Sequence, residues 1–313
     1  MHITLYKGLA LLANPALIGL TVLILAIIWM LRDERDRVRP LLVIALVFNL
    51  VYGWFLSVVM GRENGLVQWK YDDILLNLDA ALGLRAAPIA GLFQGWERFP
   101  LLVIYQLMVP MMAAWFLVAR RCQLSGALVL TYAVELVVGP ALYGLVPGCG
   151  PLYAFRSQWQ HPPAVEAATV RLSGMPNAFP SLHVGTAFIL VLFSCGWRSR
   201  AASLAFFAAT LLATLSTGEH YVIDLVAGLA FGCFAASAGQ RRLLESFGFG
   251  TLTLGWSLAV RWEYRFLLVH VWVLRIFVAL TLFAALSAVF RAWFSPRPAS
   301  LRHGDVDDLK DVR

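Results

Sequence analysis

Residues 124–145 read LSGALVLTYAVELVVGPALYGL and carry a single charged side chain, that of Glu135. A stretch this long and this apolar can cross the hydrocarbon core of a bilayer as a helix. The expected spans of this kind are residues 8–31, 40–60, 99–118, 124–145, 181–197, 200–216, 220–238 and 269–290. Because a helix pairs its backbone polar groups internally, the sequence predicts an all-α fold, a polytopic transmembrane helical bundle of about eight spans.

The composition of the 313-residue chain agrees with this fold class. Hydrophobic residues make up 60% and charged residues 14%, where soluble domains contain about 45–50% and about 25%. These values exclude soluble, disordered and collagen-like proteins. The four cysteines have no C-x-x-C spacing, so we expect no zinc site and no structural disulfide. Residues 1–294 should form a single membrane domain, followed by a polar tail at 295–313.

Arginines gather in four places that fall on one side of the membrane when the spans alternate. They are Arg32, Arg35, Arg37 and Arg39, then Arg120 and Arg121, then Arg198 and Arg200, then Arg241 and Arg242. The excess of positive charge in these loops predicts that this side is cytoplasmic, in the plasma membrane or, in a bacterium, the inner membrane. The loops 61–98 and 146–180 then face outward. Anionic lipid head groups explain the net charge of +7 without a nucleic-acid partner.

Two segments do not fit a simple span. Residues 71–82, YDDILLNLDAAL, alternate polar and apolar side chains at helical spacing but are too short and too charged to cross. We expect an amphipathic helix lying in the outer interface, with Trp69 and Trp96 as anchors. The apolar part of 239–268 is too short to span comfortably. The sequence therefore does not indicate on which side of the membrane the C-terminal tail lies.

The first stretch whose side chains could take part in a reaction is residues 177–185, NAFPSLHVG. Pro180 suits the start of a helix. The free N–H groups that follow, beginning at Leu182, and the hydroxyl of Ser181 would form an anion-binding site at a positive helix end. His183 would lie about one turn into this helix, beside any anion bound there.

The second stretch is residues 216–224, STGEHYVID. His220 and Asp224 are four residues apart and share a helix face. The carboxylate can accept from one ring nitrogen of His220, which leaves the other nitrogen free as a base, nucleophile or ligand. An unpaired carboxylate inside a span costs about 2.5–3.5 kcal/mol, so the pairing has a physical reason. Both stretches are expected at the outer face.

These residues resemble a known family. Pro180-Ser181-Leu182-His183 and the run from His220 to Gly228, HYVIDLVAG, are similar to motifs of the type 2 phosphatidic acid phosphatase superfamily. The versions found here look most like the inositol phosphorylceramide synthase branch, a group of sphingolipid enzymes, and the Asp-rich segment 72–82 also resembles that branch. The resemblance covers roughly residues 70–240 and implies a six-helix phosphatase-type core.

The resemblance implies a reaction through phosphohistidine that needs no metal and no cofactor. His220 would attack phosphorus, and Asp224 would orient it. His183 would protonate the leaving oxygen and then deprotonate the acceptor, while Ser181 and the N–H of Leu182 would hold the phosphate oxygens.

The sequence also departs from the family's common pattern in its cations. No Lys followed seven residues later by Arg-Pro precedes Pro180, and Thr214 stands where an Arg would lie six residues before His220. Arg156 and Arg171, in the loop that leads into Pro180, are the candidates for binding the phosphate.

Three functions are then open. The favoured one is transfer of a phospho-alcohol head group from a phospholipid to a lipid hydroxyl. An alternative is hydrolysis, in which water takes the phosphoryl group of a lipid phosphate or pyrophosphate. A third is a non-enzymatic lipid transporter with His183 and His220 as a proton relay, which would favour ionisable residues near the bilayer midplane rather than at span ends.

Overall fold

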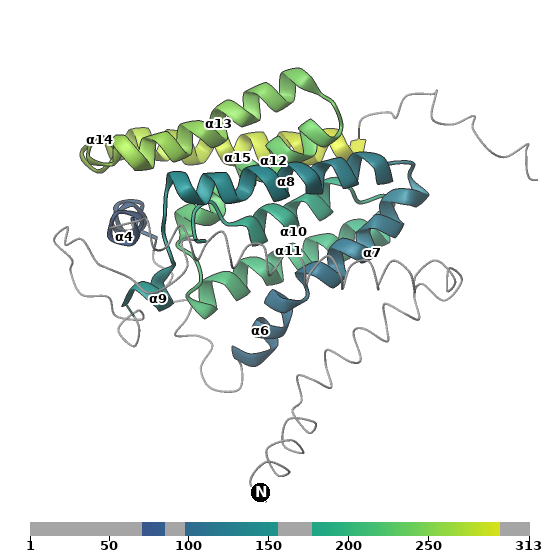
Figure 1. The fold of residues 1–313 in the computed structure, drawn as a ribbon, viewed down its shortest axis with the longest axis horizontal. Coiled ribbons are helices and arrows are strands. Elements are labelled where there is room, and N and C mark those ends of the chain that lie inside the picture. Colours follow the sequence, from purple (N-terminus) through teal and green to yellow (C-terminus); the bar gives the residue numbers. More distant parts are fainter. Residues whose placement is uncertain (1–70, 85–97, 156–176, 295–313) are drawn as a thin grey trace, which may run out of the picture.

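A computed structural model describes residues 71–84, 98–155 and 177–294, and every element in them is a helix (Figure 1). The helices are α4 (Asp72–Ala81), α6 (Arg98–Gln106), α7 (Met108–Arg121), α8 (Ser125–Leu145), α9 (Pro151–Phe155), α10 (Leu182–Leu192), α11 (Trp197–Thr217), α12 (Val222–Gly239), α13 (Leu243–Trp262), α14 (Tyr264–Val269) and α15 (Val271–Phe294). The predicted features outside the described residues are the spans 8–31 and 40–60, Trp69, Trp96, Arg156, Arg171 and the tail 295–313.

The predicted polytopic helical bundle is confirmed. Within the described part of the chain, α8, α11, α12, α13 and α15 are long and apolar enough to cross a membrane. The expected span 99–118 is a bent pair instead, because α6 and α7 meet at Leu107 at an angle of 51°. The expected span 181–197 is shorter than predicted. Its helix α10 has 11 residues, about 17 Å at 1.5 Å per residue, and is enclosed by other helices.

Helix α12 lies at the centre of the bundle and packs against α8, α10, α13 and α15. Its small residues allow close approach to α10. A methyl group added at Gly228 would lie 2.5 Å from the carbonyl oxygen of Ser181, and one at Gly232 would lie 2.9 Å from that of Gly185. Small residues at such crossings are the usual way in which membrane helices approach closely. This contact brings the two sequence motifs together.

We expect Gly228→Ala to lower both thermal stability and activity, because the new methyl group must push the start of α10 away from α12. Gly248→Ala in α13 is the matched control, since nothing lies within 4 Å of the methyl group it would add. Thermal unfolding in detergent measures the difference. Equal unfolding midpoints for the two variants would contradict the packing described here.

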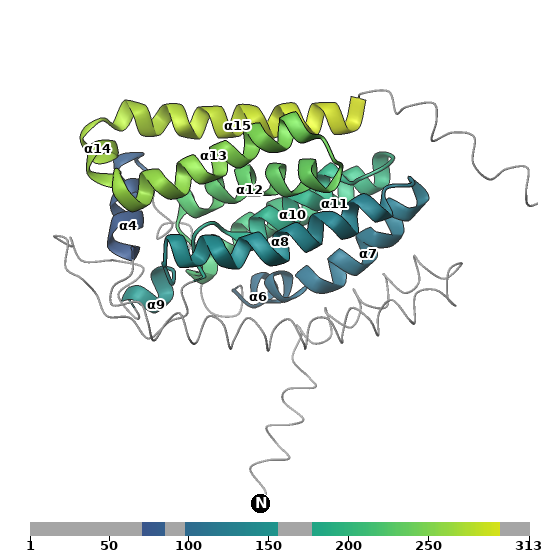
Figure 2. The ribbon, with the colours of Figure 1, turned by 45° about the horizontal axis from the view of Figure 1, so that its top comes forward.

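The segment 239–268 was expected to be too short to span, and this expectation is wrong. It contains α13, a 20-residue helix that pairs with α15 through the short α14, and Figure 2 shows this pair along one side of the bundle. The hydroxyl groups of Thr251, Thr253 and Ser257 donate to the carbonyls four residues earlier. Internal bonding of this kind removes much of the cost of placing polar side chains in a span.

The arginine-bearing turns lie together at one end of the bundle. Arg200 donates to the carbonyl of Trp293, 2.8 Å away and one residue before the end of α15. Glu245 forms ion pairs with Arg242 and Arg291 at 3.7 Å and 3.5 Å. The end of α15 at Phe294 therefore lies on the same side of the bundle as the arginines. The sequence alone did not indicate the side on which this end of the chain lies.

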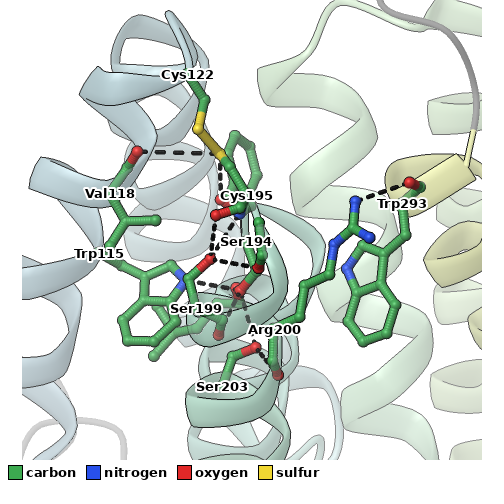
Figure 3. Close-up of a disulfide and its surroundings, with 12 residues drawn as sticks. Trp115, Val118, Cys122, Ser194, Cys195, Ser199, Arg200, Ser203 and Trp293 are labelled. Atoms are coloured by element: carbon green, nitrogen blue, oxygen red, sulfur yellow. Dashed lines mark hydrogen bonds between the residues drawn. A yellow bond between two sulfur atoms is a disulfide. The ribbon is translucent and has the colours of Figure 1, made fainter.

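The prediction of no structural disulfide is wrong. Cys122, which follows α7, is bonded to Cys195 in the turn between α10 and α11, with the two Cα atoms 6.5 Å apart (Figure 3). A separation of 73 residues gives no sequence signal for this pairing. Within the described residues, Cys149 and Cys233 are buried thiols outside any disulfide.

Candidate active site

The two histidines singled out from the sequence lie side by side at the end of the bundle opposite the disulfide. His183 is the second residue of α10, and His220 lies in the turn between α11 and α12. Their ring centroids are 6.4 Å apart. The backbone N–H of Ser181 donates to the carbonyl of Asp224 at 3.0 Å, so a direct bond joins the two motifs.

Two acceptor oxygens lie near the same ring nitrogen of His220, and the nearer one is hydrogen-bonded to it. Its Nδ1 lies 2.8 Å from the carbonyl oxygen of Ala178 and 3.5 Å from Oδ2 of Asp224. Because a carbonyl oxygen can only accept, this contact places the proton on Nδ1 and leaves the lone pair on Nε2. The predicted neighbour Asp224 is thus present, but the closer partner of the ring is a backbone carbonyl that the sequence did not indicate.

Asp224 has a second task at this turn. Its Oδ2 accepts from the backbone N–H of Tyr221 at 2.8 Å, in a capping box at the start of α12. A carboxylate at a helix N-terminus is favoured by the helix dipole. The same oxygen atom therefore stabilises the helix start and lies next to the His220 ring.

Burial sets the protonation of His220. Its side chain is almost completely buried, and desolvation lowers its pKa to about 4, against the weaker opposing effects of the Glu219 carboxylate and the Ala178 carbonyl. His220 is therefore neutral near pH 7. A neutral imidazole with a free Nε2 is the form that can act as a nucleophile.

His183 has an aromatic neighbour that no sequence motif indicates. The ring of Tyr105, from α6, stacks on the His183 ring with centroids 3.8 Å apart and an angle of 19° between the planes. This contact limits rotation of the imidazole. No motif surrounds Tyr105 in the sequence, where it is one aromatic residue among the apolar side chains of its span.

The start of α10 has the features of an anion-binding helix end. Ser181 is its N-cap, and the Ser181 hydroxyl accepts from the N–H of Val184 at 3.4 Å. In the described part of the chain, the N–H groups of Leu182 and His183 have no recorded acceptor. They are two of the unsatisfied donors that make a helix N-terminus attractive to phosphate.

Comparison with known proteins identifies the family. The family model described as PAP2 superfamily matches residues 73–238, more than half of the chain. The chain belongs to the PAP2 superfamily. The match runs from α4 to α12 and includes both histidine motifs, whereas α13, α14 and α15 lie beyond it. No curated protein and no solved structure matches the chain significantly.

Membership of the PAP2 superfamily supports a phosphatase-type enzyme acting on a lipid phosphate in a membrane. Thr214, at the position where an Arg would lie, donates its hydroxyl to the carbonyls of Thr210 and Leu211 inside α11. No group of three or more His, Cys, Asp or Glu side chains in the described segments could hold a metal ion.

Helix α4 differs from the expected interfacial helix in one respect. The predicted helix forms, but Asp72 and Asp79 on its polar face are each only 1% exposed. They point toward the turn that carries His220, and α4 packs against α12 and α14. The charged face is therefore used within the protein rather than presented to water.

Glu135 has the partner that its depth in α8 requires. Its Oε1 accepts from the hydroxyl of Thr186, one turn of α10 below His183. The methyl groups of Leu182 pack against Gly139 one turn further along α8. The hydrogen bond from Thr186 stabilises a carboxyl group that would be costly at this depth if it were unpaired.

Proposed function

We propose that this PAP2 protein is a phosphotransferase that moves a phospho-alcohol head group from a phospholipid to a lipid hydroxyl through a phosphohistidine at His220. The observation that carries the proposal is the state of the His220 ring. Its Nδ1 is held by the carbonyl of Ala178 and by Asp224, so Nε2 is free beside the start of α10.

In the first step, Nε2 of His220 forms a bond to phosphorus and the bond from phosphorus to the lipid oxygen breaks. His183 enters this step as the protonated imidazolium, gives a ring proton to that oxygen, which leaves as an alcohol, and becomes neutral. The negative charge on the phosphate oxygens is met by the N–H groups of Leu182 and His183 and by the Ser181 hydroxyl. Asp224 stabilises the positive charge on the His220 ring.

In the second step, His183 takes the proton of an acceptor hydroxyl, whose oxygen forms a bond to phosphorus. The bond between phosphorus and Nε2 breaks, and His220 returns to its neutral form. Water in place of the alcohol would give hydrolysis through the same intermediate. The similarity of the motifs to the inositol phosphorylceramide synthase branch and the burial of His220 favour a lipid acceptor.

Purified protein given labelled phospholipids or lipid phosphates, with and without ceramide or diacylglycerol, tests the proposal. We expect a new phospholipid species that requires the added acceptor. Release of free phosphate or of a free phospho-alcohol, unchanged by the acceptor, would assign the protein as a hydrolase. No turnover of any lipid phosphate would favour the transporter alternative.

Metal independence gives a prediction of its own. Because two histidines and a helix end supply the nucleophile, the acid and the anion site, activity should persist in excess chelator. Turnover measured before and after chelation, and again after adding magnesium or zinc, checks this. Complete loss in chelator with recovery in metal would overturn the phosphohistidine mechanism.

The pH profile follows from the burial of His220. Its neutral form is the nucleophile, so activity is present above its pKa and is lost as the pH falls through it. With the pKa lowered to about 4, the acidic limb of kcat/KM should lie well below the ordinary histidine value near 6.5. An acidic limb at 6.5 or above would contradict a buried, neutral nucleophile.

We also propose that the site faces outward, because the arginine-bearing turns lie at the opposite end. In a variant without native cysteines, Leu84→Cys should be labelled from outside and Arg198→Cys only from inside. The reverse labelling would place the histidines in the cytoplasm and the disulfide between Cys122 and Cys195 outside, where disulfides persist.

A further inference from the structure

The turn that carries His220 is short and depends on contacts from elsewhere in the chain. Helix α11 ends at Thr217 and α12 begins at Val222, so four residues separate them. The first N–H groups of a helix have no partner within the helix and need acceptors from outside it. The identity of those acceptors decides how firmly the His220 turn is held.

One acceptor comes from α4. Oδ2 of Asp79 accepts from the N–H of Val222 at 2.8 Å, and Oδ1 accepts from the N–H of Ile223 at 2.9 Å. Asp79 lies 143 residues before Val222 in the chain, and its side chain is buried. Together with the bond from Tyr221 to Asp224, this places carboxylate oxygens on three consecutive N–H groups directly after His220.

A second carboxylate of α4 supports the other side of the same turn. Asp72 accepts from the N–H of Gly150 at 2.9 Å, from the N–H of Cys149 at 3.1 Å and from the hydroxyl of Tyr221 at 2.9 Å. It thereby joins the loop that follows α8 to the residue next to His220.

That loop in turn packs on the turn before His220. The N–H of Leu152 donates to the carbonyl of Gly218 at 2.8 Å. Gly150 has a φ of +88°, and a methyl group there would lie 2.1 Å from the carbonyl oxygen of Glu219, so the two backbones touch. Only glycine allows both this conformation and this approach.

The spacing of the two aspartates explains how one short helix makes both contacts. Asp72 and Asp79 are seven residues apart, which is two helical turns, so both side chains lie on one face of α4. The carboxylate of Asp79 also occupies the start of α12, where an anion could otherwise bind. The open helix end beside the histidines is then that of α10.

We propose that α4 is a clamp, made by Asp72 and Asp79, that positions His220 for attack on phosphorus. Both are positioning residues, because they act through the backbone around His220 and contact no reacting atom. The proposal rests on the proposed role of His220 as the nucleophile. It gives the Asp-rich segment of the chain a defined task in the reaction.

The test uses Asp79→Ala, with Asp79→Asn as a milder variant that keeps one acceptor oxygen. Asp73→Asn is the matched control, since Asp73 is the neighbouring residue of α4, is half-buried, and makes no recorded bond to the His220 turn. In the full-length protein we expect Asp79→Ala to lower kcat at least 100-fold with little change in KM. The kcat of Asp79→Asn should lie between that of Asp79→Ala and that of the wild type. The kcat of Asp73→Asn should equal that of the wild type.

Two further measurements separate positioning from simple loss of fold. A loosened turn admits water to His220, so the acidic limb of kcat/KM should move up toward pH 6.5 in Asp79→Asn and stay in place in Asp73→Asn. Carbethoxylation of His220, followed by mass spectrometry, should become faster in both Asp79 variants, whether or not they turn over substrate.

The outcomes for the clamp and for the proposed function are distinguishable. A wild-type protein that forms phosphohistidine at His220, with Asp79→Ala equal to it in kcat, acidic limb and carbethoxylation, would overturn the clamp alone. Faster carbethoxylation in the Asp79 variants of a protein that never forms phosphohistidine would support the clamp and refute the role of His220. Equal losses in Asp79→Asn and Asp73→Asn would show only a general effect of α4 and would also overturn the proposal.

Discussion

Replacement of His220 by Ala should abolish the phosphoenzyme completely. In the structure, Nε2 of His220 is the free nitrogen of a ring whose other nitrogen is held by Ala178 and Asp224. With the ring removed, no group in this position can form a bond to phosphorus. Rapid-quench experiments with a phosphate-labelled substrate should then yield no acid-labile label on the protein, whatever the leaving group.

His183→Ala is the comparison that separates the two histidines. A general acid contributes about 10²–10⁴-fold to a rate, and its contribution shrinks when the leaving group is a weak base. The His183 variant should therefore still become labelled with a nitrophenol leaving group and fail with an alkyl alcohol. Label on His220→Ala but never on His183→Ala would mean that the two roles are reversed. Unchanged turnover in both variants would refute the enzymatic mechanism.

Replacement of Asp224 by Asn should preserve the helix start but slow the reaction by about 10³–10⁴-fold, the size of effect seen when the aspartate of a catalytic triad becomes an amide. The amide oxygen can still accept from the N–H of Tyr221, as Oδ2 does now at 2.8 Å. That oxygen also lies next to Nδ1 of His220, but the neutral amide offers no negative charge to the ring during attack.

The measurement for Asp224→Asn is the rate of phosphoenzyme formation beside the thermal unfolding midpoint. We expect a large loss of rate with a small change in midpoint, because the capping bond remains. Gly248→Ala serves again as a control for handling of the purified protein. A rate close to that of the wild type would mean that the Ala178 carbonyl alone holds the His220 tautomer, and Asp224 would then be a capping residue only.

The fold class followed from the sequence, because a bilayer leaves few options to an apolar chain. Expected spans such as 124–145 and 220–238 correspond closely to α8 and α12, since length and apolarity decide which helices can cross. Both histidine motifs were also recognisable, because His220 and Asp224 lie on one helix and their spacing is local. The predicted spans differ from the structure in two places. In α13, polar side chains bond within the helix and so allow a span, and in α10, packing against other helices allows a helix shorter than a span.

Tertiary structure decided the partners of the site residues. The carbonyl of Ala178 lies 42 residues before His220 in the chain, and the carboxylate of Asp79 lies 143 residues before Val222. Helical periodicity relates residues within one element and says nothing about which elements meet, so no local pattern indicates these contacts, the ring of Tyr105 against His183, or the disulfide at the other end. The sequence by itself determined a membrane helical bundle with two chemically competent motifs. Only the packing of α10 and α4 against α12 decided which atoms hold His220, because backbone groups at helix ends take whatever acceptors the fold brings within reach.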